Sequence, residues 1–199
     1  MADATYTRLI AGADQARDPF DTHVLACILA IAADEALRDG IAWTETVGLT
    51  AGPLSALLAR WFPGANEPIA DVPVARAGDE DCLVDLLRQA AASPFAADFL
   101  APMVARRAQR PDHLWQDLGL RARTELSALM MRHFHVLAVR NTKDMKWKKY
   151  LYRTICGDSG YALCSAPSCA ECADFDGCFG EETGESFLAR ARRAAETAA

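Results

Sequence analysis

Four of the chain's seven cysteines lie within fifteen consecutive positions near its C-terminal end. These four, which we call the cysteine run, are Cys164, Cys169, Cys172 and Cys178, and their spacing is C-x4-C-x2-C-x5-C. Turn-forming Pro, Ser, Asp and Gly residues fill the intervals, so the backbone can wrap around a shared centre. Thiolates select soft metal centres, namely zinc, cuprous copper and iron–sulfur clusters. The cysteine run therefore predicts a metal or cluster site.

The spacing favours an iron–sulfur cluster but leaves zinc open. Structural zinc usually takes two C-x2–4-C pairs that a longer stretch separates. Here one such pair, Cys169 and Cys172, has a single cysteine at short range on either side, which is closer to ferredoxin-type runs. A disulfide framework fits poorly, because the chain is long, has an odd number of cysteines and shows no secretory signal. The alternatives are a structural zinc loop with four cysteine ligands on a helical interaction or regulatory protein, and a redox sensor that uses the same thiols.

A basic band precedes the cysteine run in a chain whose net charge is −6. Residues 121–153 hold nine basic and two acidic side chains, whereas residues 1–120 hold nine basic and seventeen acidic ones. An electropositive surface here would offset cluster charge or attract an anion, and the alternative is an ordinary solvated helix face. The candidate residues are Arg140, Lys143, Lys146, Lys148 and Lys149. Nucleic acid is not an expected partner, because the basic stretch is short and the whole chain is acidic.

Helical periodicity dominates the elements that must position these residues, so we expect an all-α fold. A single helical domain over residues 1–160, with a surface linker at about 63–78, is expected to carry the irregular cysteine loop. Residues 161–199, which hold that loop and a short C-terminal helix, are expected to pack as part of the same domain. Helices are expected over residues 22–39, 53–62, 79–92, from 94 onward with a kink at Pro102, 121–139 and 145–156.

Two further cysteines, Cys27 and Cys82, fall on apolar helical faces, so we expect both to be buried. The N-terminal residues lack the features of a signal peptide, and no apolar run reaches the ~18 residues of a membrane span. A reducing cytoplasm without membrane contact is the expected location.

Three stretches together resemble the NifQ family of nitrogenase iron–molybdenum cofactor biosynthesis. They are H-L-W-Q-D-L-G-L (113–120), R-H-F-H-V-L-A-V-R-N-T-K-D-M-K-W-K-K-Y-L-Y-R-T-I-C (132–156), and the cysteine run with the C-F-G that ends at Gly180. The resemblance implies that the four cysteines bind a molybdenum–iron–sulfur cluster, and that the protein donates molybdenum without catalytic turnover. Molybdate is the implied metal source. The implied partners are the scaffold complex NifEN, the nitrogenase iron protein, and molybdate or a molybdenum storage or delivery protein.

Such a cluster leaves a ligand position open beside the cysteines. A heterometal cubane with three irons needs three cysteines, so its remaining corner could take the fourth cysteine, a histidine or an oxygen donor. His113, His133 and His135 come before the cysteine run, and Cys156 is nearer to it. His133 and His135 are about 200° apart around a helix and cannot share one face. For His133 the alternative is a hydrogen-bonded place in the core, and for Cys156 it is packing at a helix end.

Overall fold

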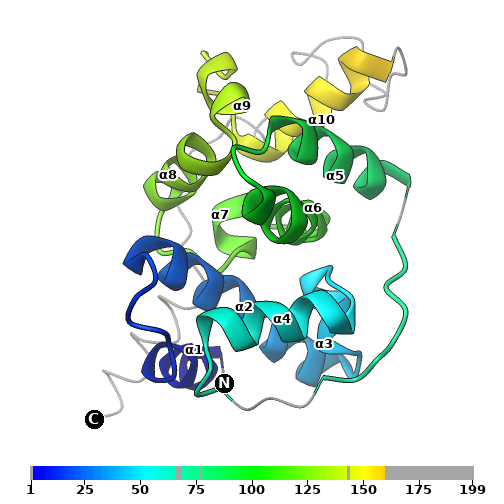
Figure 1. The fold of residues 1–199 in the computed structure, drawn as a ribbon. Helices are drawn as coiled ribbons and strands as arrows, with labels where there is room; N and C mark the ends of the chain where they lie inside the picture. Colours follow the sequence, from blue (N-terminus) through cyan, green and yellow to red (C-terminus); the bar gives the residue numbers. More distant parts are fainter. Residues whose placement is uncertain (1, 66–68, 77, 143, 160–199) are drawn as a thin grey trace, which may run out of the picture.

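The computed structural model describes residues 2–65, 69–76, 78–142 and 144–159, and side chains as far as Ile155. Wherever this part of the chain has regular structure, that structure is helical, which confirms the all-α prediction (Figure 1). The cysteine run and Lys143 lie outside the described residues, and so do the loop and short helix expected after residue 160. The predicted division of the chain at residue 160 therefore stays a prediction.

The helices follow one another through short connections, apart from the longer connection between α4 and α5. In chain order they are α1 (Ala2–Ala11), α2 (Pro19–Asp39), α3 (Trp43–Val47), α4 (Ala51–Trp61), α5 (Gly78–Ala90), the π-helical turn η1 (Ala96–Leu100), α6 (Ala101–Ala108), α7 (Leu114–Asp117), α8 (Arg123–His133), α9 (His135–Arg140) and α10 (Trp147–Ser159). None of the helices in the described ranges is both long enough and apolar enough to cross a membrane.

The long helix α2 runs through the core, and its ends follow local sequence rules. Asp18 is the N-cap, and its carboxylate accepts a hydrogen bond of 3.0 Å from the backbone N–H of Asp21. Gly40 ends the helix with φ +67°, a left-handed conformation that glycine adopts without steric cost. The expected start at residue 22 was therefore three residues late, because Pro19 occupies the first turn.

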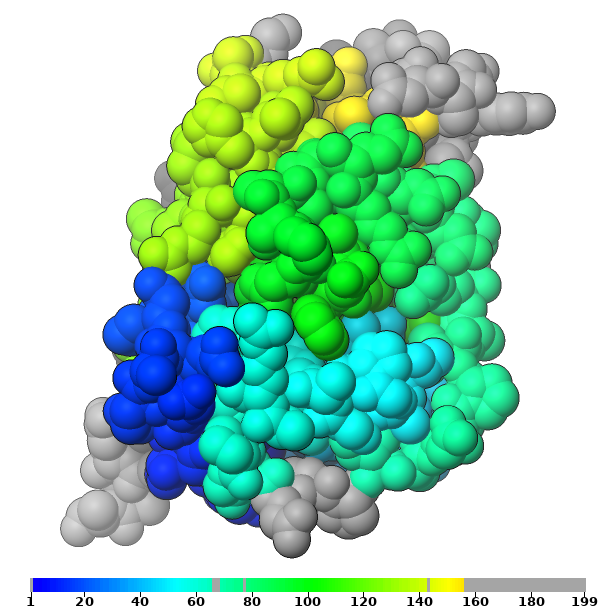
Figure 2. Space-filling view, viewed as in Figure 1, coloured from blue at the N-terminus to red at the C-terminus, as the bar shows by residue number. Residues whose placement is uncertain are grey.

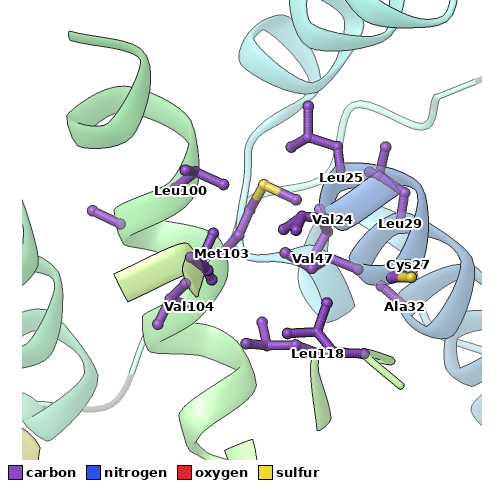
Figure 3. Packing of buried hydrophobic residues seen from close by; sticks show 14 of the residues in the cluster. Val24, Leu25, Cys27, Leu29, Ala32, Val47, Leu100, Met103, Val104 and Leu118 are labelled. Carbon is purple, nitrogen blue, oxygen red and sulfur yellow. The ribbon is translucent and has the colours of Figure 1, made fainter. Parts of the chain in front are cut away.

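Apolar side chains of α2 pack against α3, α6 and the residues after α7. Figure 3 shows Val24, Leu25 and Leu29 of α2 facing Val47 of α3 and Met103 of α6. Cys27 is buried in this cluster, as predicted. Cys82 on α5 is exposed, so the prediction that it is buried was wrong. Its neighbours Leu83, Val84 and Leu87 are the α5 residues that enter the core.

The single helix expected over residues 121–139 is two helices. Phe134 separates α8 from α9 because its backbone, at φ −133° and ψ 47°, lies outside the helical region. The carbonyl of His133 accepts a hydrogen bond of 2.9 Å from the N–H of Ala92, and the side chain of Phe134 is fully buried. These tertiary contacts stabilise a break that apolar periodicity alone does not reveal.

Pro102 lies in the first turn of α6, directly after a π-helical turn. Proline has no backbone N–H, so it cannot make the usual helical bond to the carbonyl four residues earlier. The turn η1, directly before α6, is π-helical, a form that appears mostly as single-turn bulges in α-helices. The helix expected from residue 94 onward is thus a π-helical turn followed by α6, and the kink at Pro102 stays a prediction.

Candidate functional site

The helix α10 is the last described element before the cysteine run, and it ends five residues before Cys164. Its apolar stripe consists of Trp147, Leu151 and Ile155, which recur every four residues and are 6%, 0% and 5% exposed. The helix packs against α5, and in Figure 1 the two lie next to each other. The last described helix before the predicted site is therefore fixed to the helical body.

Tyr152 adds a polar contact between α10 and α5. Its hydroxyl donates a hydrogen bond of 3.5 Å to a carboxylate oxygen of Asp79. Burial, and after it the negative charge of Asp79, raise the pKa of Tyr152 to about 12. The hydroxyl therefore stays protonated as a donor at neutral pH.

Lys148 anchors the first turn of α10 through its ammonium group. The group donates hydrogen bonds to the carboxylate of Asp117 and to the carbonyl oxygens of Arg110 and Asp112. Its side chain is 20% exposed and that of Asp117 is 4% exposed. Lys148 is thus mostly buried, and its charge is matched by Asp117 at the end of α7 and by two carbonyls between α6 and α7, so it does not contribute an unmatched positive charge to the surface for which it was a candidate.

Burial controls the protonation of this pair. It raises the pKa of Asp117 and lowers the pKa of Lys148, because desolvation disfavours both charged forms. Each partner's charge opposes the shift of the other. The pair therefore depends on mutual contact, and loss of either member leaves a buried group without its counter-ion.

The polar network continues from Asp117 to α2 through Arg107, whose side chain is fully buried. Its Nε donates to the carbonyl oxygen of Asp117 at 2.6 Å, and its two terminal nitrogens bind the carboxylate of Glu35 at 2.6 and 2.7 Å. Arg110 adds a second contact to Glu35 at 3.0 Å. The network thus joins α2, α6, α7 and α10.

Glu35 holds a negative charge despite its burial. Burial raises its pKa, but the hydrogen bonds and charge of Arg107 outweigh this effect, and the pKa of Glu35 lies below its ordinary value of 4.5. Glu35, Arg107 and Asp117 were not predicted from the sequence. One signal was present: Arg107 follows Met103 and Val104 at helical spacing, on the apolar face of α6.

A hollow of about 190 Å³ opens beside this network. Charged side chains that line it are Asp34, Glu35, Asp112 and Asp117 on the acidic side and Arg38 and Arg110 on the basic side. Carboxylates thus outnumber guanidinium groups in the lining, which disfavours an oxyanion such as molybdate. The hollow is therefore not the positively charged anion site that the basic band suggested.

The three histidines considered as possible extra ligands lie in three different settings. His133 is buried, and its Nε2 lies 2.9 Å from a carboxylate oxygen of Asp21, which is the hydrogen-bonded core position considered as the alternative. His135 is exposed on α9, and His113 is the N-cap of α7. The structure does not bring the three together into a shared group.

The donor set whose chemistry fits a soft metal is the four thiols of the cysteine run. They and the side chain of Cys156 lie outside what the structure describes. Within the described residues, no group of three or more His, Cys, Asp or Glu side chains is placed to hold a metal ion. The ligand assignment therefore rests on sequence and stays a prediction.

The basic band is partly matched by carboxylates. Arg123 pairs with Asp144 at 2.8 Å, and Arg132 pairs with Asp18 at 2.6 Å. Of the predicted surface residues, Arg140 is exposed, while Lys146 and Lys149 are partly buried. Among the described residues, the charge of Lys148 is matched by Asp117, and Lys143 lies outside the described residues, so the electropositive face stays a prediction.

Comparison with known proteins gives consistent matches. A family model described as NifQ matches residues 24–180. "Protein NifQ homolog" of Sinorhizobium fredii is 42% identical over 172 residues, which cover 84% of this chain and 75% of that protein. "Protein NifQ" of Rhodobacter capsulatus is 39% identical over 139 residues, which cover 68% of this chain and 77% of that protein. "Protein NifQ" of Azotobacter vinelandii is 44% identical over 84 residues, which cover 42% of this chain and 43% of that protein. No solved structure matches the chain significantly.

Proposed function

Because the chain belongs to the NifQ family of nitrogenase iron–molybdenum cofactor biosynthesis, we propose that it carries a molybdenum–iron–sulfur cluster and donates molybdenum to that assembly. The cluster is cargo, held by the thiolates of the cysteine run. One observation carries the proposal: the range that matches the family, 24–180, contains all four cysteines.

The chemistry of the donor set supports this role. Thiolates bind iron, and sulfur-rich surroundings favour soft ligation of a metal that arrives as molybdate. Delivery by ligand exchange breaks metal–ligand bonds and makes new ones on the acceptor, and no substrate is turned over. The protein therefore acts as a carrier and not as an enzyme.

The anchoring of α10, which precedes the cysteine run in the chain, supports this proposal. Apolar contacts of α10 with the body and the ammonium of Lys148 hold the helix that leads to the cysteine run. A carrier must both hold and release its metal, so the cargo has to be within reach of a partner. The partners we propose are the scaffold complex NifEN and the nitrogenase iron protein. Molybdate or a molybdenum storage or delivery protein supplies the metal in the reducing cytoplasm.

Metal transfer tests the proposed function directly. The protein is loaded anaerobically with iron, sulfide and molybdate, separated from free metal, and incubated with molybdenum-free NifEN and the iron protein. We expect molybdenum to move to NifEN, as measured by metal analysis after the proteins are separated. The donor role would be contradicted if molybdenum stayed on the loaded protein while free molybdate labelled NifEN.

A further inference from the structure

The helices α8 and α9 expose apolar side chains on the side away from the core. Met131, Val136 and Val139 are 48%, 47% and 49% exposed. Val136 and Val139 are three residues apart and share one face of α9. Nδ1 of His135 lies 3.1 Å from Sδ of Met131, which connects that face to the last turn of α8. We call Met131, His135, Val136, Val139 and Arg140 the α9 surface.

The stability of α9 does not explain why valine occupies positions 136 and 139. Valine is β-branched and is a weaker helix former than unbranched residues, and α9 has only six residues. Because the two residues are about half exposed, they also forgo about half of the free energy that full burial would provide. Isolated exposed apolar residues need no explanation, but a contiguous group of them often marks a surface that another molecule covers. In Figures 1 and 2, α8 and α9 form the yellow-green upper corner of the molecule.

The α9 surface is preformed. Phe134 and Leu137, on the opposite side of the same segment, are 0% and 2% exposed and fix α9 to the core. After α9, the side chain of Asn141 donates to the carbonyl of Met145 and accepts from its N–H, both at 2.9 Å. A surface that is already ordered loses little conformational entropy when it binds a partner.

Arg140 supplies the positive charge at the edge of the α9 surface. The chain has no Asp or Glu between residues 126 and 143. Arg132 is matched by Asp18 and Asp21 of the neighbouring helix start, whereas Arg140 is exposed at the end of α9. An apolar centre with a positive edge is complementary to a partner that has an apolar depression with a negative edge.

A second copy of the chain fits this surface less well. A two-fold contact would place the α9 surface against itself, and the exposed charge of each Arg140 would then face like charge. Three exposed apolar side chains are also far fewer than the ~20–30 residues that each side of a standard stable interface contributes. The surface suits a transient contact with a different protein.

We propose that the α9 surface docks an acidic protein partner, and that this partner is the recipient of molybdenum. The second part rests on the proposed function. The docking residues and the anchored helix α10 are neighbours in the chain, so a partner held at α9 would meet the protein close in sequence to its cargo site.

Site-specific cross-linking tests this docking surface. The photoreactive residue p-benzoylphenylalanine is placed at Val139, and a matched control carries it at Leu37 of α2, which is 65% exposed. Each full-length protein is irradiated with purified NifEN at low and high salt. We expect an adduct with NifEN from position 139 that decreases at high salt, and little or none from position 37.

A binding measurement with substitutions completes the test. The double variant Val136→Ser/Val139→Ser is expected to bind NifEN at least tenfold more weakly, and Arg140→Glu to bind more weakly with a smaller salt dependence. The control double variant Leu37→Ser/Ile41→Ser should bind as the unsubstituted protein does. Circular dichroism and the thermal midpoint of the Val136→Ser/Val139→Ser variant should be unchanged, because both side chains already face water.

Four outcomes would overturn the docking proposal. They are adducts only between two copies of the chain, adducts only with the chain's own residues 160–199, equal adducts from positions 37 and 139, and no adduct with NifEN. Iron and molybdenum contents of the double serine variant, measured in parallel, should match those of the unsubstituted protein. Normal metal content without cross-linking would overturn this surface alone, whereas protein that never holds iron or molybdenum would refute the proposed function.

Discussion

The ammonium group of Lys148 matches its surroundings donor for acceptor. Lysine has three N–H donors on one nitrogen, and here three oxygens accept them: one from Asp117 and the backbone carbonyls of Arg110 and Asp112. The planar guanidinium of arginine could not converge its donors on the same point. Lys148 was predicted to lie on the surface because K-W-K-K looks like a solvated helix face, whereas its carboxylate partner lies 31 residues earlier.

Substitution of Lys148 should weaken the fold at this point. We expect Lys148→Met to lower the free energy of unfolding by about 2–4 kcal/mol, because Asp117 is left buried without its counter-ion. Denaturant titration of the substituted and unsubstituted proteins measures this change. The neighbouring Lys149→Met serves as the matched control and should cost under about 1 kcal/mol, as is usual for partly exposed charges. Equal losses from both variants would contradict the anchoring role of Lys148.

At the cysteine run, we expect Cys169→Ala to abolish retention of the cluster and to leave the helical circular dichroism largely intact. The described helices have a core of their own, whereas the thiolates are the predicted metal ligands. Iron and sulfide analysis after anaerobic reconstitution gives the first result, and the far-ultraviolet spectrum gives the second.

Cys27→Ala and Cys82→Ala are the controls, since Cys27 packs in the core and Cys82 lies exposed on α5. Both should retain the metal content of the unsubstituted protein. Global unfolding of Cys169→Ala would make the cysteine run a structural element and would weaken the carrier proposal.

Among the helices, local sequence predicts those whose ends carry their own signals. The C-terminal end of α2 at Asp39 was predicted correctly, and Gly40 follows it in a left-handed conformation. The five-residue helix α3 was not predicted, because it is too short to show a period. The break at Phe134 was missed as well, since apolar residues continue through it and only the contact with Ala92 reveals it.

For the candidate site, the sequence predicts the chemistry of the cysteine run but not the polar contacts that hold α10. The residue types and spacing of the cysteine run indicate its chemistry without any structure. The polar network that holds α10 depends on distant pairs, such as Glu35 with Arg107, which are 72 residues apart. A single sequence does not show which charged residues are buried together in the folded protein.

The link between α2 and α6 should give the protein a measurable acid sensitivity. The pKa of Glu35 is lowered from 4.5, so its contribution to stability is present above pH 4.5 and is lost as the pH falls through the folded-state pKa. Glu35→Gln should remove this part of the pH dependence. At pH 7 it should also lower the free energy of unfolding by about 3–5 kcal/mol, because Arg107 is fully buried.

Denaturant titrations at pH 7, 5, 4 and 3 measure both effects of Glu35→Gln. Asp39→Asn is the control, since that carboxylate pairs with Arg38 at the surface and should change stability little. A Glu35→Gln variant that is as stable as the unsubstituted protein at pH 7 would contradict the structural role of this pair.

In the whole molecule, we expect the helical body and the cysteine run to have separate roles. The body buries one apolar cluster that includes residues from α1 to α10. A polar network then fixes α10, and the basic stretch 121–153 supplies both that helix and the α9 surface. On this account, the body supports and docks, and the cysteine run carries the metal.

Elemental analysis of protein purified without oxygen is the most direct test of the proposed cargo. Molybdenum, iron, sulfide and zinc are measured per chain, before and after anaerobic reconstitution. We expect iron and sulfide, with molybdenum present once molybdate is supplied. One zinc per chain, with no iron even after reconstitution, would contradict the carrier role and would make the cysteine run a structural zinc loop.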